Sequence, residues 1–364
     1  MAPIRTALVH NIVTPYRNVL FNALSDHKKV DLHVFYCAES HDKRNWTVPD
    51  NLGHDHTFLS GITFDRSDTH FHANPSVISK LVRDEFEVTI VGGISNLTMQ
   101  LGFLTSKMSC DGNVLWTERI LPPVNPIGKL VSPLFRTFAN RADSLIVPTN
   151  TARQFQQKRG IEQRRIYTAP NVVDNTVYYN NDTGGNPIRI LFVGQLIERK
   201  GISYLIDAYS MIDNDEVELY IVGDGPRRRA FERRARQQNL EVIFTGWISE
   251  NQKRRLFANA DLFVLPSIED LAPLVLNEAL ASGLPVLTTE GVGNAPDMIV
   301  KGGNGYIVPT ADTDALAKRL ASLTSNSDKL EKMGQRSERI SDERFSPTVA
   351  ANQFAKAVEA AALK

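Results

Sequence analysis

The chain has 364 residues, enough for two domains of ordinary size. A hydrophobic fraction of 42% and a charged fraction of 23% predict globular domains with buried cores. The 41 basic and 41 acidic residues balance, which argues against a general attraction to nucleic acid. The two cysteines, Cys37 and Cys110, exclude a disulfide framework.

Short apolar, β-branched runs alternate with helical patterns along the chain. The predicted strands are RTALVH (5–10), VDLHVFY (30–36), VTIVGG (88–93), NVLWTE (113–118), SLIVP (144–148), IRILFVG (188–194), ELYIVGDG (218–225), VIFTG (242–246), LFVLPS (262–267) and LPVLTTE (284–290). Several of these runs are apolar at consecutive positions, which indicates parallel strands covered on both faces. We therefore predict an α/β chain with two doubly wound, Rossmann-like parallel sheets.

A polar stretch with two glycines, NNDTGGNP (180–187), marks the predicted domain boundary. The expected domains are residues 1–183 and 184–345. Residues 346–364 have an amphipathic helical pattern, and we expect this helix to pack back on the first domain. Two such domains that face each other form a cleft at the carboxyl ends of their strands, where α/β sheets bind ligands.

The stretch SIEDLAPLVLNEALASGLPV (267–286) predicts a helix over residues 273–282. Pro273 suits the first helical position, and Gly283 followed by Pro285 is a stop signal. The helix begins directly after a predicted buried strand, so its positive end points into the expected cleft. Its free N–H groups form a candidate anion site with contributions from Leu271, Ala272 and Leu274.

Two carboxylates flank the start of this helix, Asp270 before it and Glu278 within it. Glu278 lies five residues past Pro273, about 7.5 Å along the helix axis. That rise is comparable to the reach from a phosphate to a ribose, so Glu278 could hold ribose hydroxyls and Asp270 a group beyond the phosphates. The spacing is equally compatible with a surface glutamate and a turn aspartate.

A second stretch, RILFVGQLIERKGISYLIDAY (189–209), has the order strand, glycine turn, basic pair, helix. Lys200 stands directly before Gly201, where an ammonium can face a diphosphate. A third stretch, LYIVGDGPRRRAF (219–231), is another strand with a glycine-rich turn. It lacks the GxGxxG fingerprint, which disfavours a dinucleotide-dependent oxidoreductase.

Five runs follow one another in the second domain: FVGQLIERKG, YIVGDGPRR, VIFTGWIS, ADLFVLPSIEDLAPLVLNEALASGLPV and GVGNAPDMIVKGGNGYIVP. In this order the chain resembles the retaining nucleotide-sugar glycosyltransferases of family four, which have the GT-B fold. ADSLIVPTNTARQFQQKRGIEQRRIYTAPNVVD (142–174) in the first domain also matches. The resemblance is strong from about residue 141 onward and loose before it.

The resemblance implies a role for each matching position. Lys200 would contact the diphosphate, Glu278 would hold the ribose, and Asp270 would face the donor sugar. The resemblance also implies that no metal or other cofactor is needed, since side chains and helix ends neutralise the leaving group. The remaining donor-site positions are Gly194, Gln195, Arg199, Trp247, Ile248, Leu271, Ala272, Pro273 and Leu274.

Three departures from the family pattern concern the same region. Gln195 stands where the family usually has an arginine, so the leaving-group stabilisation would be weaker or would move to a neighbour such as Arg199. Glu118, in LWTER, is the nearest polar counterpart of a family histidine, since all eight histidines lie at or before His72. Asp270 replaces the usual glutamate of the pair. We nevertheless count Glu118 with Lys200 and Asp270 as candidate catalytic residues.

These observations predict a metal-independent, retaining enzyme of polysaccharide biosynthesis. It would move a hexose or N-acetylhexosamine from a nucleoside-diphosphate sugar, with UDP favoured over GDP, to a hydroxyl of a glycan or lipid-linked glycan. A catalytically silent nucleotide-sugar-binding partner protein is the first alternative. A phosphorylase-type enzyme of the same fold is the second.

Other segments bear on the acceptor and on location. Tyr16 and Arg17 follow the first strand and could meet an acceptor or cap the next helix. The segment GKLVSPLFRTFANR (128–141) could rest on an anionic membrane or pack into the core. The chain start lacks a signal-peptide pattern, so we expect a cytoplasmic protein with a peripheral contact on the inner membrane face and no nucleic-acid partner.

Two patterns are compatible with metal ligands but have simpler interpretations. His54 and His56, and His70 and His72, are spaced by two residues, and we interpret both pairs as a solvated strand face. Asp312–Thr313–Asp314 only spells a metal-binding DxD, and Asp312 is more simply a helix cap. We therefore predict no metal site.

Overall fold

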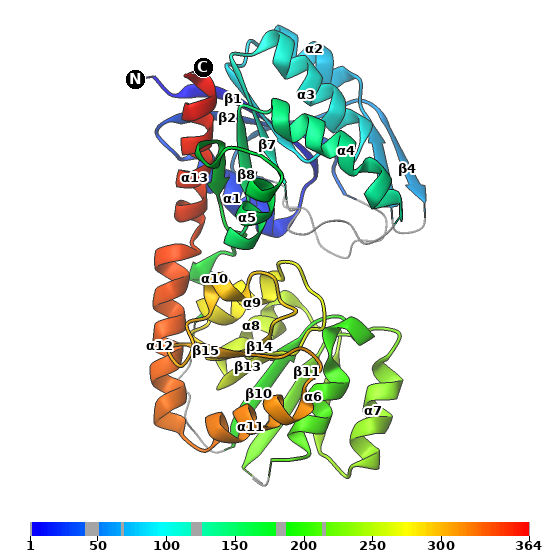
Figure 1. The fold of residues 1–364 in the computed structure, drawn as a ribbon, viewed down its shortest axis with the longest axis vertical. Helices are drawn as coiled ribbons and strands as arrows, with labels where there is room; N and C mark the ends of the chain where they lie inside the picture. Colours follow the sequence, from blue (N-terminus) through cyan, green and yellow to red (C-terminus); the bar gives the residue numbers. More distant parts are fainter. Residues whose placement is uncertain are drawn as a thin grey trace. The chain divides into compact units, whose positions relative to one another are not determined.

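The structure, a computed structural model, describes residues 2–40, 51–66, 69–117, 126–179, 187–212 and 216–363. It divides into two compact units (Figure 1). Unit 1 comprises Met1–Val172 and Pro347–Lys364, and unit 2 comprises Val173–Ser346. Unit 2 thus begins earlier than the boundary predicted from sequence, and residues 180–186 of that predicted linker lie outside the described residues.

Unit 1 is built on a seven-stranded sheet in which every neighbouring pair is parallel. In spatial order its strands are β3 (Asp55–Phe58), β2 (Val30–Ala38), β1 (Ile4–Ile12), β6 (Val88–Gly92), β7 (Gly112–Trp116), β8 (Ser144–Val147) and β9 (Ile166–Thr168). An antiparallel hairpin, β4 (Ile62–Arg66) and β5 (Thr69–Ala73), stands apart from this sheet. The helices are α1 (Pro15–Ser25), α2 (Ser76–Arg83), α3 (Leu97–Ser109), α4 (Pro126–Arg141), α5 (Asn150–Lys158), the short 3-10 helix η1 (Gln163–Arg165) and α13 (Pro347–Ala362).

Consecutive residues of β1 are buried on opposite faces of this sheet, as expected for a parallel strand in a doubly wound fold. Leu8 belongs to the cluster that includes side chains of α1 and α13, whereas Val9 packs beside Gly102 of α3. The C-terminal helix α13 therefore contributes to the core of unit 1, where the rings of Phe354 and Trp116 meet edge to face at 5.1 Å.

Unit 2 has a six-stranded parallel sheet. Its strands in spatial order are β12 (Val242–Gly246), β11 (Val217–Val222), β10 (Ile188–Val193), β13 (Leu262–Leu265), β14 (Val286–Thr289) and β15 (Gly305–Val308). The helical elements are η2 (Asn175–Val177), η3 (Glu198–Lys200), α6 (Ile202–Tyr209), α7 (Arg228–Gln237), α8 (Glu250–Ala258), α9 (Leu274–Ala281), α10 (Ala295–Met298), α11 (Thr313–Thr324) and α12 (Ser327–Arg344).

The strand order of unit 2 reverses between β10 and β13, because the chain adds strands outward from β10 on one side and from β13 on the other. In an open α/β sheet this topological switch point opens a crevice at the carboxyl ends of the two strands. A ligand site is therefore expected at the loops that follow β10 and β13.

Candidate functional site

Lys200 is carried to the switch point of unit 2 by the short helix η3, which follows β10. Gly201 ends η3 with a positive φ of 69°, and a Cβ at this position would collide with the carbonyl oxygen of Pro266. The backbone N–H of Ile268 also donates to the carbonyl of Arg199 at 2.7 Å. The close approach allowed by glycine thus fixes Lys200 against the carboxyl end of β13.

Lys200 forms an ion pair there with Asp270, the carboxylate in the loop after β13. The two side chains are only 10% and 13% exposed. The backbone of Asp270 is held on both sides, since its N–H donates to Gly291 at 2.9 Å and its carbonyl accepts from Gly293 at 2.8 Å. Two sequence-predicted residues, 70 positions apart in the chain, are therefore direct partners.

Arg199 adds a second cation to this cluster. Its Nη1 lies 3.9 Å from Oδ1 of Asp270 and donates to the carbonyl of Glu269 at 3.0 Å. Two cations thus share one carboxylate. An ammonium has three hydrogen-bond donors, so Lys200 can keep its ion pair with Asp270 and still donate to an added anion.

The amino end of α9 follows directly. The helix spans Leu274–Ala281, and Pro273 is its N-cap with extended backbone angles of −67° and 123°. The predicted helix start at Pro273 is therefore one residue too early, because Pro273 has not yet turned into the helix. Gly283, with a positive φ of 64°, follows the C-cap Ser282 as predicted.

The first N–H groups of α9 are available to a ligand. No side chain caps the helix, and within the described part of the chain no group accepts from the N–H of Leu274 or Val275. Leu271 is exposed, and Ala272 and Leu274 are half-buried, so the loop is open to solvent, whereas Pro273 is buried. A helix of this kind has four initial N–H groups without internal partners and a partial positive charge, which together bind anions.

Glu278 lies further along α9 and has a cation of its own. Its Oε1 accepts from Nζ of Lys253 in α8 at 2.9 Å, and Lys253 also pairs with Glu250 at 2.9 Å. Burial alone would lower the pKa of Lys253, but the two carboxylates raise it above its ordinary value. Lys253 was not found from sequence, because nothing in the spacing of positions 253 and 278 signals a contact between two helices.

Tyr178 lies close to the carboxylates of Glu278 and Glu250. Burial, followed by the charges of Glu278 and Glu250 and a hydrogen bond with Glu278, raises the pKa of its hydroxyl. The tyrosine enters from the segment that opens unit 2, directly after η2.

The glycine turns after β10, β11 and β12 pack against one another at the same edge of the sheet. Gly194 donates to Val222 at 3.0 Å, and Gly223 donates to Gly246 at 3.0 Å. Gly223 has a φ of 128°, and a Cβ there would collide with the carbonyl oxygen of Gly194. Of the predicted donor-site side chains on these turns, Gln195 and Trp247 are exposed and Ile248 is half-buried.

The acceptor-side candidates lie in unit 1, at the start of α1. Tyr16 is half-buried, whereas Arg17 is only 5% exposed. The Arg17 guanidinium lies 4.3 Å from the ring centre of Trp116 and donates to Oδ1 of Asn171 at 3.0 Å. Burial lowers the pKa of Arg17 to about 10. Glu118, the third catalytic candidate, lies outside the described residues.

The interpretation of the paired histidines as a solvated strand face is wrong for two of them. His54 is 8% exposed and hydrogen bonds with Tyr36 at 3.0 Å and with Asn22 at 2.7 Å. His72 is 1% exposed and lies 3.1 Å from the hydroxyl of Thr63.

Among the described residues, no group of three or more His, Cys, Asp or Glu side chains could hold a metal ion. Asp312 caps α11, its side chain accepting from Ala315 at 2.9 Å.

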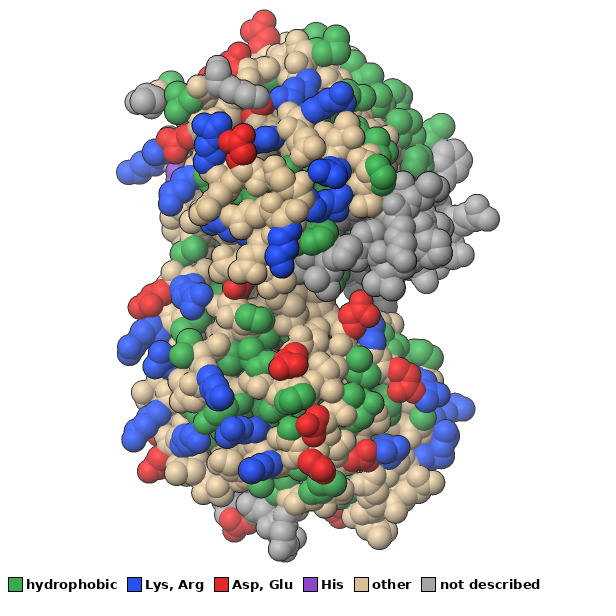
Figure 2. All heavy atoms as spheres, viewed as in Figure 1, with side chains coloured by type: hydrophobic (Ala, Val, Ile, Leu, Met, Phe, Trp, Pro, Cys, Tyr) green, Lys and Arg blue, Asp and Glu red, His purple; other side chains and the backbone are tan. Residues whose placement is uncertain are grey.

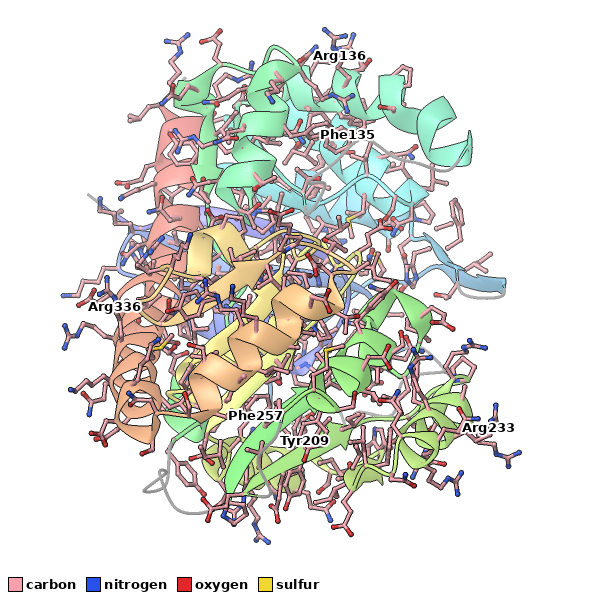
Figure 3. The ribbon with its side chains drawn as sticks, turned by 60° about the horizontal axis from the view of Figure 1, so that its bottom comes forward. Phe135, Arg136, Tyr209, Arg233, Phe257 and Arg336 are labelled. Carbon is pink, nitrogen blue, oxygen red and sulfur yellow. The ribbon has the colours of Figure 1, made fainter. Side chains whose placement is uncertain are left out.

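The segment considered for membrane contact forms α4, in which Phe135 and Phe138 are buried. Phe138 meets Phe103 at 4.9 Å, and Arg136 points outward in Figure 3. These two phenylalanines therefore pack into the core. Leu134 of α4 is 42% exposed. Large hydrophobic side chains are also exposed on α2 and α3 (Figure 2), namely Ile78, Val82, Leu97, Leu104 and Met108. In the part of the chain that the structure describes, no helix has the length and hydropathy needed to cross a bilayer. Contact with a membrane surface stays a prediction.

A protein-family model matches the second half of the chain. Residues 180–340 match the family model described as "Glycosyl transferases group 1". This range holds Lys200, Asp270, Lys253 and Glu278.

Two curated relatives are similar to the chain over part of its length. The amylovoran biosynthesis glycosyltransferase AmsK of Erwinia amylovora is 32% identical over 148 residues, which cover 38% of this chain and 36% of AmsK. The N-acetyl-alpha-D-glucosaminyl L-malate synthase of Bacillus anthracis is 26% identical over 201 residues, 52% of each chain. The similarity thus spans about half or less of each relative.

A solved structure matches nearly the whole chain. The crystal structure of Anabaena Alr3699/HepE in complex with UDP has a TM-score of 0.77, at 17% identity, and the match covers 98% of this chain and 99% of that one. Such structural neighbours are GT-B proteins, so the predicted fold class, a GT-B fold with two doubly wound parallel sheets, is confirmed.

Proposed function

We propose that the chain is a glycosyltransferase that moves a hexose or N-acetylhexosamine from a nucleoside-diphosphate sugar to a hydroxyl group. UDP is the favoured nucleotide and GDP the next, and the acceptor is a glycan or a lipid-linked glycan. The names of the matched family model and relatives support the reaction class, and the UDP in the Alr3699/HepE structure supports the nucleotide.

One observation carries the proposal. Lys200, Asp270 and the uncapped amino end of α9 meet at the topological switch point of unit 2. Two cations, one carboxylate and free helix N–H groups suit a diphosphate, which needs both positive charge and hydrogen-bond donors.

The proposed reaction is retaining and needs no metal ion. The bond from the anomeric carbon to the diphosphate breaks, positive charge develops on the sugar, and the acceptor hydroxyl attacks from the same face. The departing phosphate oxygen takes the hydroxyl proton. Lys200 and Arg199 would stabilise the negative charge on the leaving diphosphate, and Asp270 would hold Lys200 in place beside the donor sugar.

The donor roles of the other residues remain part of the proposal. Glu278 would accept hydrogen bonds from ribose hydroxyls, and Trp247 and Ile248 would border the base. Gly194 and Gln195 would approach the phosphates. In unit 1, Tyr16 and Glu118 are the acceptor-side and catalytic candidates, and Arg17 would support the acceptor side through its contact with Tyr16.

Two observations favour a second candidate, a partner protein that binds nucleotide sugars without turning them over. Gln195 offers no positive charge where relatives of the resembled family have arginine, and the ammonium of Lys200 is already engaged by Asp270. Weak or absent turnover with intact binding is the expected signature of this candidate.

Thermal unfolding of the chain with UDP, GDP and ADP sugars tests the donor assignment. A ligand at 100 times its Kd adds about 2.7 kcal/mol to the free energy of unfolding, and we expect UDP sugars to raise Tm most. A melting curve unmoved by every nucleotide sugar contradicts the proposal.

Labelled UDP-glucose and UDP-N-acetylglucosamine then separate enzyme from silent partner. Release of UDP by the pure protein, unaffected by EDTA, supports a metal-independent transferase, and dependence on added phosphate would indicate a phosphorylase. The anomeric configuration of the product, read by NMR, decides between retention and inversion.

A further inference from the structure

The ion pair between Lys253 and Glu278 joins two helices at the carboxyl edge of the unit 2 sheet. The Lys253 side chain is 16% exposed and that of Glu278 is 12% exposed. Burying charges in this way brings little net stability, since the loss of hydration offsets much of the attraction. Stability alone therefore gives a weak reason for the pair.

Lys253 does not need Glu278 as its counter-ion. Glu250, three residues earlier on α8, already pairs with the same ammonium at 2.9 Å, from a side chain that is 68% exposed. Arg254, 5.9 Å from the ring centre of Tyr178, is a further cation beside these two carboxylates. The carboxylate oxygens of Glu278 can therefore accept hydrogen bonds from neutral hydroxyl groups without being needed to neutralise Lys253.

Tyr178 constrains the same carboxylate from another side. Its ring meets the ring of Phe257, labelled in Figure 3, edge to face at 6.1 Å, so the phenol has little freedom to move. The charge of Glu278 is one cause of the raised pKa of the Tyr178 hydroxyl, after burial, so the phenol and the carboxylate are neighbours. A carboxylate has about four lone-pair directions, and Lys253 uses one of them, so others stay open to a ligand.

We propose that Lys253 and Tyr178 are positioning residues that orient the Glu278 carboxylate toward the ribose hydroxyls of the bound nucleotide. The proposal rests on the proposed function and deepens it, because it makes these two residues determinants of selectivity for ribose over deoxyribose. Neither residue touches the nucleotide. Both act by holding the Glu278 carboxylate in one orientation before the ligand arrives.

The test measures calorimetric binding of UDP and of 2′,3′-dideoxy-UDP to the full chain and its variants. Lys253→Met should weaken UDP about tenfold, the usual scale for a lost charged hydrogen bond. It should leave dideoxy-UDP within about twofold of the unaltered chain, because that ligand has no ribose hydroxyl for Glu278 to hold. Lys253→Arg should restore most of the UDP affinity, since it keeps a cation beside Glu278.

Glu250→Gln is the matched control. It removes the other carboxylate from the same ammonium, on the solvent side, and should leave UDP binding within about twofold. Tyr178→Phe keeps the ring that packs on Phe257 and removes only the hydroxyl. It should weaken UDP about threefold and leave dideoxy-UDP unchanged, which keeps the proposal testable if Lys253→Met does not fold.

The outcomes separate this inference from the proposed function. If the unaltered chain binds neither UDP nor GDP, the nucleotide assignment fails and the positioning role fails with it. If the unaltered chain binds UDP but Lys253→Met weakens UDP and dideoxy-UDP equally, or weakens neither, the positioning role alone is overturned. In that case the pair is a structural link between α8 and α9.

Discussion

Each unit places a cation in the first helical element after its first strand, Arg17 in α1 and Lys200 in η3, and the surroundings of the two cations differ. Arg17 follows β1 in unit 1 and is covered by the ring of Trp116, with Asn171 as a hydrogen-bond partner. Lys200 follows β10 in unit 2 and faces Asp270, with the second cation of Arg199 beside it.

An aromatic face and a neutral amide hold a guanidinium in a fixed place. A guanidinium stacked on a ring in this way stabilises the packing of the side chains around it. An ion pair between a lysine and a carboxylate beside an open helix end can accept a third, anionic partner without rebuilding the loop. At equivalent places in the two folds, Arg17 in unit 1 thus contacts an aromatic ring and an amide. Lys200 in unit 2 forms an ion pair beside helix N–H groups that can bind an anion.

The largest expected effect comes from Lys200→Ala. Turnover should fall on the order of 100- to 1,000-fold, the scale for the loss of one group that stabilises transition-state charge. The free energy of unfolding should change far less, because Arg199 stays near Asp270. The assay is release of UDP from a UDP sugar. Arg233→Ala, whose side chain points away from unit 2 (Figure 3), is the control and should leave turnover unchanged. Normal turnover in Lys200→Ala would move the phosphate site elsewhere.

Acid should weaken unit 1 before unit 2. Burial, aided by the charge of Arg17, lowers the pKa of His10 from 6.5 to about 3, and burial lowers that of His54 to about 4. Below about pH 6.5 the unfolded chain takes up protons that the folded chain does not, so stability present at neutral pH is lost as the pH falls. Between pH 6 and pH 5 the two histidines together account for about 2 to 3 kcal/mol.

All eight histidines lie at or before His72, so unit 2 has none. Hydrogen exchange of peptides from each unit, corrected for intrinsic rates, measures the difference. Equal loss of protection in both units would contradict the assignment to His10 and His54. His54→Gln should make the loss in unit 1 shallower.

Arg17→Met should destabilise the chain by about 2 kcal/mol, the sum of a cation–aromatic contact and a hydrogen bond. We expect UDP affinity to stay unchanged, since Arg17 and the nucleotide site belong to different units. Urea unfolding and calorimetry make the two measurements. Tyr16→Phe is the milder control, with an expected change under about 0.5 kcal/mol. A variant with full stability but lost transfer would show that Arg17 serves the acceptor and not the packing.

The smallest expected effect is that of Glu278→Ala, which should weaken UDP binding about tenfold through the loss of hydrogen bonds to ribose. Equilibrium binding gives the value. Glu269→Ala removes an exposed carboxylate from the loop that precedes α9 and should change little. Unchanged UDP affinity in Glu278→Ala would remove its ribose role.

The ten strands predicted from sequence all correspond to strands of the two sheets, because each is rich in apolar and β-branched residues. Most of them are buried, whereas β12 is a half-exposed edge strand of the unit 2 sheet. The strands that sequence analysis missed are different. β3 and β9 are the two edges of the unit 1 sheet, β15 is an edge of the unit 2 sheet, and β4 and β5 form the separate hairpin. These missed strands have three to five residues each, so their sequences give a weaker periodic signal.

The site could be predicted only where its residues lie in recognisable stretches. Lys200 and Asp270 stand directly after predicted buried strands, so the parallel topology itself brings them to one edge. Lys253 and Tyr178 occupy unremarkable positions on other elements, and only the ion pair with Glu278 and the ring contact with Phe257 reveal them. His54 was misjudged because its neighbours in space, Tyr36 and Asn22, are distant in sequence.

The position of α13 has a consequence for co-translational folding. The last helix fills the core beside Trp116, so unit 1 consists of two stretches of chain with all of unit 2 between them. The first stretch of unit 1 cannot cover that aromatic face until α13 has been synthesised after unit 2. Unit 2 has no such delay and can complete its sheet while unit 1 is still unfinished.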